Sequence, residues 1–227
     1  LAFAALALSH ATQAQTPSAA VTSQQLQELR EVADTSPAAL LKLEHIEAGI
    51  PADANYALRR ELALAQMSVR QDSLSSDETL KLIEALRALA KDNGDENTVS
   101  LMDIRRIYMN HVDDDIGKFI DQLNVVSAHI RSDASAEVME ALELSYGNMY
   151  FDAGHFDTAL RHQLAALDWA EKLPFGRERA RLFRLGTIAD LYNAMDLPEQ
   201  ALEYLQQALA QPAANIPSRN LTSLLAT

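Results

Sequence analysis

The sequence has no cysteine and little glycine, and both shortages exclude kinds of chemistry. Without cysteine, the 227 residues can form no disulfide, no thiolate nucleophile and no cysteine-ligated metal site. The 7 glycines never lie next to one another or two positions apart, which excludes a glycine-rich phosphate-binding loop. The serine motif Gly-x-Ser-x-Gly and the zinc motif His-Glu-x-x-His are missing too. We therefore predict a protein that is not an enzyme and that uses no metal or other cofactor.

Positive charge is also scarce. The chain has 19 Lys and Arg against 32 Asp and Glu, a formal net charge of −13 at pH 7. Nucleic acids and anionic membranes both require a basic surface on their partner. The composition therefore argues against nucleic acid, and we expect the partner to be a protein or peptide, or a small polar ligand.

Residues 1–14 have the pattern of a secretory signal peptide. The apolar run Leu1–Leu8 is followed by small and polar residues, with possible cleavage after Ala11 or Ala14. The run is shorter than the roughly 20 apolar residues that span a bilayer. We expect a signal peptide remnant and a periplasmic protein, tethered to the membrane only through flanking segments. An uncleaved anchor and a frayed apolar helix are the alternatives.

The remaining chain is predicted to be helical. No proline occurs between Pro51 and Pro174, and Leu, Ala, Glu and Arg are frequent there. Apolar residues recur three and four positions apart, which is typical of amphipathic helices. The breaks between these segments are short, which favours stacked antiparallel helical hairpins.

Two stretches of the chain repeat each other at an offset of 42 residues. Small, aromatic, acidic and Ala-Leu positions of the first stretch recur in the second. The matching positions are Gly147, Tyr150, Asp157, Ala159, Leu160, Ala166 and Leu167, followed by Ala189, Tyr192, Glu199, Ala201, Leu202, Ala208 and Leu209. Such a period indicates a repeat architecture, and the same offset backwards reaches a degenerate earlier unit at Tyr108.

The spacing inside each unit has a physical explanation. Gly147 allows two helices to approach closely, and Gly154 suits a left-handed cap that ends the first helix. Ala159 and Ala166 lie seven positions apart on one face, where small side chains permit close contact. Tyr150 is expected to fill a larger gap between the helices.

At these positions the chain resembles the tetratricopeptide repeat family. The first unit matches the family pattern at Gly147, Tyr150, Gly154, Phe156, Ala159 and Ala166, and the second at Ala189, Tyr192, Ala201 and Ala208. Asp196 replaces the turn glycine and Pro198 the aromatic residue. The resemblance implies an all-α, right-handed α-solenoid of about five helix pairs. The expected organisation is degenerate repeats over 15–133, units over 134–175 and 176–217, and the start of a truncated unit over 218–227.

The resemblance also implies where a partner binds. In the family, the first helix of each unit lines a concave groove, and the groove positions follow the small residue. The residues expected there, or beside them, are Arg106, Asn110, Asn148, Phe151, Asp152, Asp190 and Asn193. Asp152 and Asp190 lead us to expect a ligand with basic groups. An ordinary polar helix surface is the alternative.

The layout is similar to the periplasmic input region of bacterial membrane-bound sensors, such as diguanylate cyclases. A soluble periplasmic adaptor for envelope or secretion assembly is the alternative function. Two groups of residues could suggest a metal site, namely His155 and His162 near Asp152, and His111 beside the acidic run 113–115. Solvated polar surface explains both groups better, and no metal is expected.

Overall fold

The computed structural model describes residues 19–32, 35–110 and 116–210. These residues form ten helices and no strand, so the prediction of an all-α fold is confirmed for the described part of the chain. The helices are α1 (Ala19–Val32), α2 (Pro37–Ala48), α3 (Tyr56–Val69), α4 (Ser76–Asp92), α5 (Glu96–Met109), α6 (Ile116–Ser127), α7 (Ala136–Asp152), α8 (Phe156–Ala170), α9 (Arg177–Ala194) and α10 (Pro198–Leu209).

Oxygen-bearing side chains begin several of these helices. Such a side chain accepts a hydrogen bond from a backbone N–H of the first turn, which has no partner within the helix. Ser75 does so at α4, where the Glu78 carboxylate in turn accepts a hydrogen bond from the Ser75 backbone N–H. The other caps with this bond are Ser36, Asn55, Asp95 and Ser135. The helix starts are therefore encoded locally.

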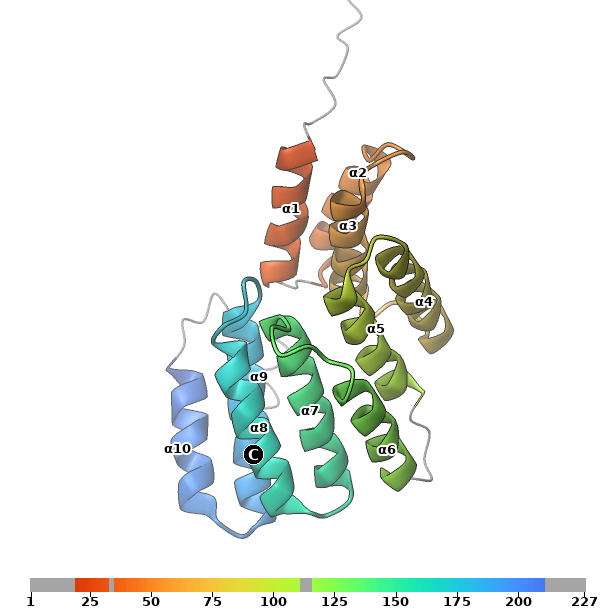
Figure 1. The fold of residues 1–227 in the computed structure, drawn as a ribbon. Coiled ribbons are helices and arrows are strands. Elements are labelled where there is room, and N and C mark those ends of the chain that lie inside the picture. The colour runs from red at the N-terminus through yellow and green to blue at the C-terminus, as the bar shows by residue number, and fades with distance from the viewer. Residues whose placement is uncertain (1–18, 33–34, 111–115, 211–227) are drawn as a thin grey trace, which may run out of the picture.

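The helices stack as successive pairs. α7 packs on α8, α9 packs on α10, and α8 packs in turn on α9, so that each pair covers the next (Figure 1). At the other end of the molecule, α1 packs beside α3 and α4 packs beside α5, and the contact between α5 and α7 joins the two halves. The described part of the chain is therefore a helical solenoid of hairpins.

Small residues lie where the paired helices touch. Ala159, Ala166, Ala189, Ala201 and Ala208 are buried, with no more than 1% of their surface exposed. At Gly147, an added Cβ would come within 2.7 Å of the Gln163 amide nitrogen on α8. The close approach of α7 and α8 therefore depends on side chains that are small or absent.

The offset of 42 residues is also visible in side-chain packing. The rings of Tyr150 and His162 stack with their centroids 5.4 Å apart, and so do those of Tyr192 and Tyr204, which stand 42 positions later. The ring of Tyr146 also stacks on that of His162, with the two centroids 5.0 Å apart. The two units therefore share an aromatic contact between their helices as well as their small residues.

The turns inside the two units have the same geometry. Gly154 has a φ of +73°, and the His155 N–H donates to the Tyr150 carbonyl at 2.8 Å. In the second unit, Asp196 has a φ of +60°, and the Leu197 N–H donates to the Tyr192 carbonyl at 2.9 Å. Among the residues that the structure describes, Asp196 is the only non-glycine with positive φ. It holds a conformation that favours glycine.

Replacing Asp196 by glycine is therefore expected to stabilise the protein by about 1 kcal/mol. Thermal unfolding followed by circular dichroism measures this as a rise in the midpoint. The matched control is Asp168→Gly, at an exposed position within α8, where glycine is a poorer helix former than aspartate by roughly 0.3 kcal/mol and should not raise the midpoint. A midpoint that Asp196→Gly leaves unchanged or lowers would contradict the strain assigned to this turn.

The apolar core runs along the whole stack. One cluster of buried side chains extends from α3 to α7, a second joins α1, α2 and α3, and a third joins α9 and α10. Of the helices that the structure describes, none is both long and apolar enough to cross a membrane.

Candidate functional site

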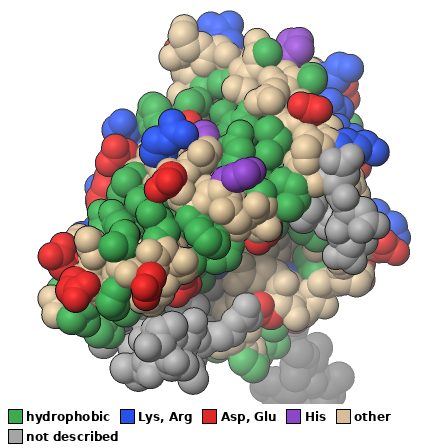
Figure 2. Space-filling model, turned by 90° about the horizontal axis from the view of Figure 1, so that it is seen from below, with side chains coloured by type: hydrophobic (Ala, Val, Ile, Leu, Met, Phe, Trp, Pro, Cys, Tyr) green, Lys and Arg blue, Asp and Glu red, His purple; other side chains and the backbone are tan. Residues whose placement is uncertain are grey.

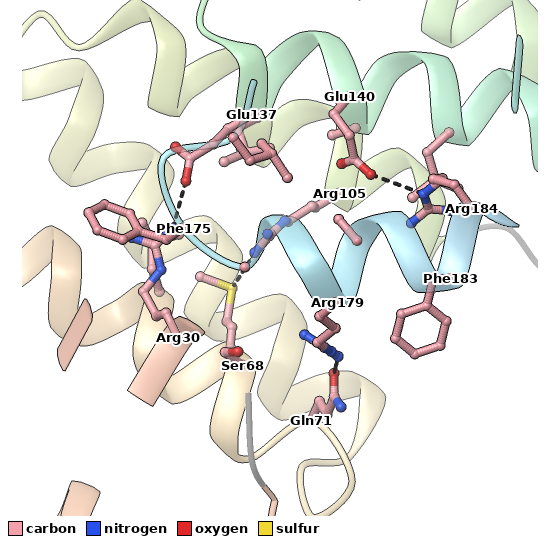
Figure 3. A pocket seen from close by; sticks show the side chains of 18 of the residues that line it. Arg30, Ser68, Gln71, Arg105, Glu137, Glu140, Phe175, Arg179, Phe183 and Arg184 are labelled. Atoms are coloured by element: carbon pink, nitrogen blue, oxygen red, sulfur yellow. Dashed lines mark hydrogen bonds and ion pairs between the residues drawn. The ribbon is translucent and has the colours of Figure 1, made fainter. Parts of the chain in front are cut away.

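The stack encloses a cavity of about 680 Å³. Every helical residue that lines it belongs to α1, α3, α5, α7 or α9, the first helices of the five pairs, and the loop before α9 completes the wall. We call this space the concave cavity. Its charged lining residues are Arg30, Arg105, Arg179, Arg184, Glu137 and Glu140 (Figure 3).

Arg30, near the end of α1, joins three parts of the stack. Its guanidinium pairs with Glu61 of α3 at 2.7 Å and with Glu137 of α7 at 2.6 Å. It also lies over the ring of Phe175, 5.6 Å from the centroid, in the loop before α9. Because only 12% of the Arg30 side chain is exposed, these pairs are shielded from solvent.

Two further contacts connect the first half of the stack to α9. Glu31 accepts a hydrogen bond from the Gly176 N–H at 2.7 Å, and Arg179 donates to the Gln71 side chain at 3.1 Å. Together with those of Arg30, we call these the closing contacts. They bring α1 next to the start of α9, as Figure 1 shows, and they form one wall of the cavity.

Glu137 lies among three arginines. Burial by itself would raise the pKa of Glu137, but the positive charges of Arg30, Arg60 and Arg105 outweigh it and hold this pKa below its ordinary value. Arg60 contributes an ion pair at 3.3 Å in addition to that of Arg30. Glu137 is therefore ionised at neutral pH and balances part of the arginine charge.

Glu140 neutralises the arginine on the opposite wall. Its carboxylate accepts from Nε of Arg184 at 3.1 Å, and the side chains are 13% and 12% exposed. Burial lowers the pKa of Arg184, and the Glu140 charge opposes that shift. Both carboxylates that line the cavity, Glu137 and Glu140, are therefore already paired with arginines.

Arg105 differs from these arginines. Nη1 of Arg105 points to Sδ of Met67 at 3.6 Å, and within the described ranges it forms no ion pair with a carboxylate. Desolvation lowers the pKa of Arg105, although an arginine keeps its charge at neutral pH. Figure 3 shows its guanidinium between α7 and α9. The cavity thus has a cation that feels the charges of Glu137 and Glu140 but has no carboxylate in direct contact.

The comparisons with known proteins agree with this architecture. The sequence model of the tetratricopeptide repeat family matches residues 137–211, which include α8, α9, α10 and all of α7 but its first residue. Residues 137–211 are therefore assigned to the tetratricopeptide repeat family. No curated protein and no solved structure gives a significant match.

Asn148 is the one expected groove residue of the tetratricopeptide repeats that lines the concave cavity, as far as the structure describes it. Its side-chain oxygen accepts from the Gln163 amide at 2.8 Å, which orients it from α8. Arg106 instead lies near Glu84 of α4, at 3.6 Å, and near Asp103, at 3.3 Å. It turns away from the cavity because Arg105 occupies the inner side of α5.

The other expected residues lie at the ends of their helices. Asn110 follows α5 and is exposed, and the ring of Phe151 packs against Phe156 at 5.7 Å. Asp152, Asp190 and Asn193 are exposed and do not line the concave cavity. A role of these residues in binding a partner stays a prediction.

The sequence pattern missed the arginines for a specific reason. Counting back 42 positions from Gly147 leads to Arg105, where the family has a small residue, so the groove was expected one position later. The helical spacing of Leu101, Arg105 and Tyr108 was the available signal. With four arginines against two glutamates, the concave cavity is positively charged, opposite to the charge expected from Asp152 and Asp190.

The histidines that could suggest a metal site have other roles or surroundings. The His162 ring packs against the rings of Tyr146 and Tyr150, and its Nδ1 lies 2.7 Å from a Glu143 oxygen. His155 is exposed where α8 begins. No group of three or more His, Asp or Glu side chains within the described ranges is placed to hold a metal ion. His111 and residues 113–115 lie outside those ranges.

Proposed function

We propose that the chain is a non-catalytic interaction and sensing module that binds a protein or peptide on its concave face. The observation that carries this proposal is the convergence of five first helices on one cavity in a chain that contains tetratricopeptide repeats. Such repeats mediate protein binding through the continuous surface that stacking creates.

Two aromatic side chains mark the part of the concave face that a partner can reach. Tyr108 of α5 is 45% exposed and Phe183 of α9 is 38% exposed, and both line the cavity. Exposed aromatic residues beside a hydrogen-bonding group are typical of binding hot spots. Asn148, which also lines the cavity, provides such a group.

Photo-crosslinking tests this surface. With p-benzoylphenylalanine in place of Phe183, we expect a discrete crosslinked product whose yield falls when Tyr108→Ala is added, because the partner then loses an anchor. The matched control places the crosslinker at Leu202 of α10, which is 54% exposed and does not line the cavity. The same products from both positions, or none from position 183, would contradict the proposal.

Exposed hydrophobic residues make the control at α10 demanding. Figure 2 shows hydrophobic side chains spread over the face seen from below, with acidic side chains gathered at one side. Leu202 and Leu209 of α10 are among the exposed large hydrophobic residues. A non-specific hydrophobic partner would therefore crosslink at position 202 as readily as at 183.

We further propose that the module works in the periplasm, as the input region of a larger membrane-bound signalling protein. The support is the signal-peptide pattern of residues 1–14 and the similarity of the layout to bacterial sensors. An alkaline phosphatase fusion after Ala210 is expected to be active in cells only when residues 1–14 are present. Equal activity without them would contradict export.

A further inference from the structure

The carboxylates that line the concave cavity are already occupied by arginines. Glu137 pairs with Arg30 at 2.6 Å and with Arg60 at 3.3 Å. Glu140 pairs with Arg184 at 3.1 Å. Arg105 is therefore left with a contact of 3.6 Å to the Met67 sulfur, and a thioether is a weak acceptor.

An arginine in this position is costly to the fold. A guanidinium has five N–H donors and keeps its charge, so desolvation without a carboxylate costs free energy. The lowered pKa of Arg105 has this desolvation as its main cause. A replacement by methionine would remove the cost, which is why the cation is better explained by binding than by stability.

The shape of the cavity points to the kind of anion. A volume of about 680 Å³ lies within the range of pockets that take small molecules. Beside the charged and polar residues, the wall includes apolar side chains such as Leu101, Leu144 and Phe175. The closing contacts cover one side, so a ligand that fits must be short at that side. A small organic acid with a short apolar body fits this volume and can contact these apolar side chains.

We propose that the concave cavity binds a small organic carboxylic acid, with its carboxylate on Arg105 and its apolar body against Leu144 and Phe175. A carboxylate can accept two parallel N–H bonds from a guanidinium, which gives the contact direction as well as strength. The proposal rests on the proposed function in taking the concave face as the binding face, and it adds the chemical class of a ligand.

Titration calorimetry of the full chain with 3-phenylpropionate tests the proposal. We expect saturable binding, and at least tenfold weaker binding of the uncharged 3-phenylpropionamide at the same ionic strength. Arg105→Met is expected to raise the Kd for the acid at least tenfold. Arg59→Met, at an exposed position of α3 outside the cavity, is the matched control and should leave the Kd within twofold.

The acid could come from a free metabolite or from the end of a polypeptide chain. Acetyl-Ala-Ala-Phe and its C-terminal amide distinguish these sources. Binding of the free-acid peptide with the same dependence on Arg105 indicates a chain terminus, whereas binding of 3-phenylpropionate alone indicates a small free acid. Both results support a carboxylate site at Arg105.

Three results would overturn the proposal. They are no binding of either acid, equal binding of acid and amide, and a Kd that Arg105→Met leaves unchanged. The far-ultraviolet spectrum checks that Arg105→Met folds, and Arg105→Lys serves as a second variant that keeps the charge without the planar fork. The Lys variant is expected to bind about fivefold more weakly than the unchanged protein. Crosslinking at position 183 can give a product even if neither acid binds. The two experiments can therefore contradict one proposal and support the other.

Discussion

Replacing Glu137 by glutamine is expected to lower the free energy of unfolding by about 3–5 kcal/mol, the usual cost of breaking a buried ion pair by removing one partner. Glu137 is 17% exposed and receives Arg30 at 2.6 Å. Its removal leaves Arg30, Arg60 and Arg105 close together, with Glu61 as the remaining carboxylate partner of Arg30. Urea unfolding followed by circular dichroism measures the change.

The matched control is Glu96→Gln. Glu96 lies in the first turn of α5, as Glu137 does in α7, but it is exposed. Like Glu137→Gln, the control loses the interaction of a carboxylate with the helix dipole, about 0.3–1 kcal/mol. Unlike Glu137→Gln, it leaves the arginines paired. If both variants lose the same small amount, the ion pairs around Arg30 do not hold the stack together.

The effect of Glu137→Gln also depends on pH. Because the pKa of Glu137 is lower in the folded protein, its ionised form contributes stability that is fully present above the ordinary value of 4.5. This contribution is lost as the pH falls from there through the lowered pKa. The difference between the unchanged protein and the variant should therefore shrink below pH 4.5, and a difference that is constant from pH 7 to about pH 3 would count against the charge mechanism.

The second large effect is expected at Ala159. Ala159→Leu adds three carbons at a position with 0% exposure, on the face of α8 that packs against α7. Overpacking of a tight contact costs about 1–3 kcal/mol, and occasionally more. Thermal unfolding should show a lower midpoint, and Ala201→Leu should behave alike in the next unit, where the exposure is 1%.

Arg161→Leu provides the comparison for this prediction. Arg161 lies two positions further along α8 and is exposed, so the same side chain is added without displacing a neighbour. Its effect should stay within about 0.5 kcal/mol, as for most surface substitutions. An Ala159→Leu variant as stable as Arg161→Leu would show that the small residues do not set the distance between the helices.

Much of the fold could be predicted because its signals are local. The positive φ at Gly154, the cap at Ser135 and the proline at the start of α10 depend on a few neighbouring residues. The buried alanines at 159 and 166 follow from helical spacing alone. A repeat then multiplies each local signal, since one unit predicts the next.

The lining of the concave cavity could be predicted only in part. Asn148 follows the regular unit and lines the concave cavity, whereas Arg106 belongs to a degenerate unit, where an error of one position turns a helical side chain by 100° about the axis. Asp152 and Asp190 have the right residue type for a groove, but they stand too far along their helices to line the cavity. The residue type alone does not determine how far along its helix a side chain lies from the cavity.

The sequence by itself determined the all-α class, the repeat of 42 residues and the small-residue contacts, because helix periodicity and capping act over a few residues. Only the tertiary structure decided the charge of the concave cavity. Arg30 meets Glu137 across 107 positions of sequence, and Arg184 meets Glu140 across 44. How far a stack of helices curves determines which side chains meet, and that curvature is the sum of small rotations between successive repeats. An acidic chain therefore encloses an arginine-lined cavity that its net charge does not reveal.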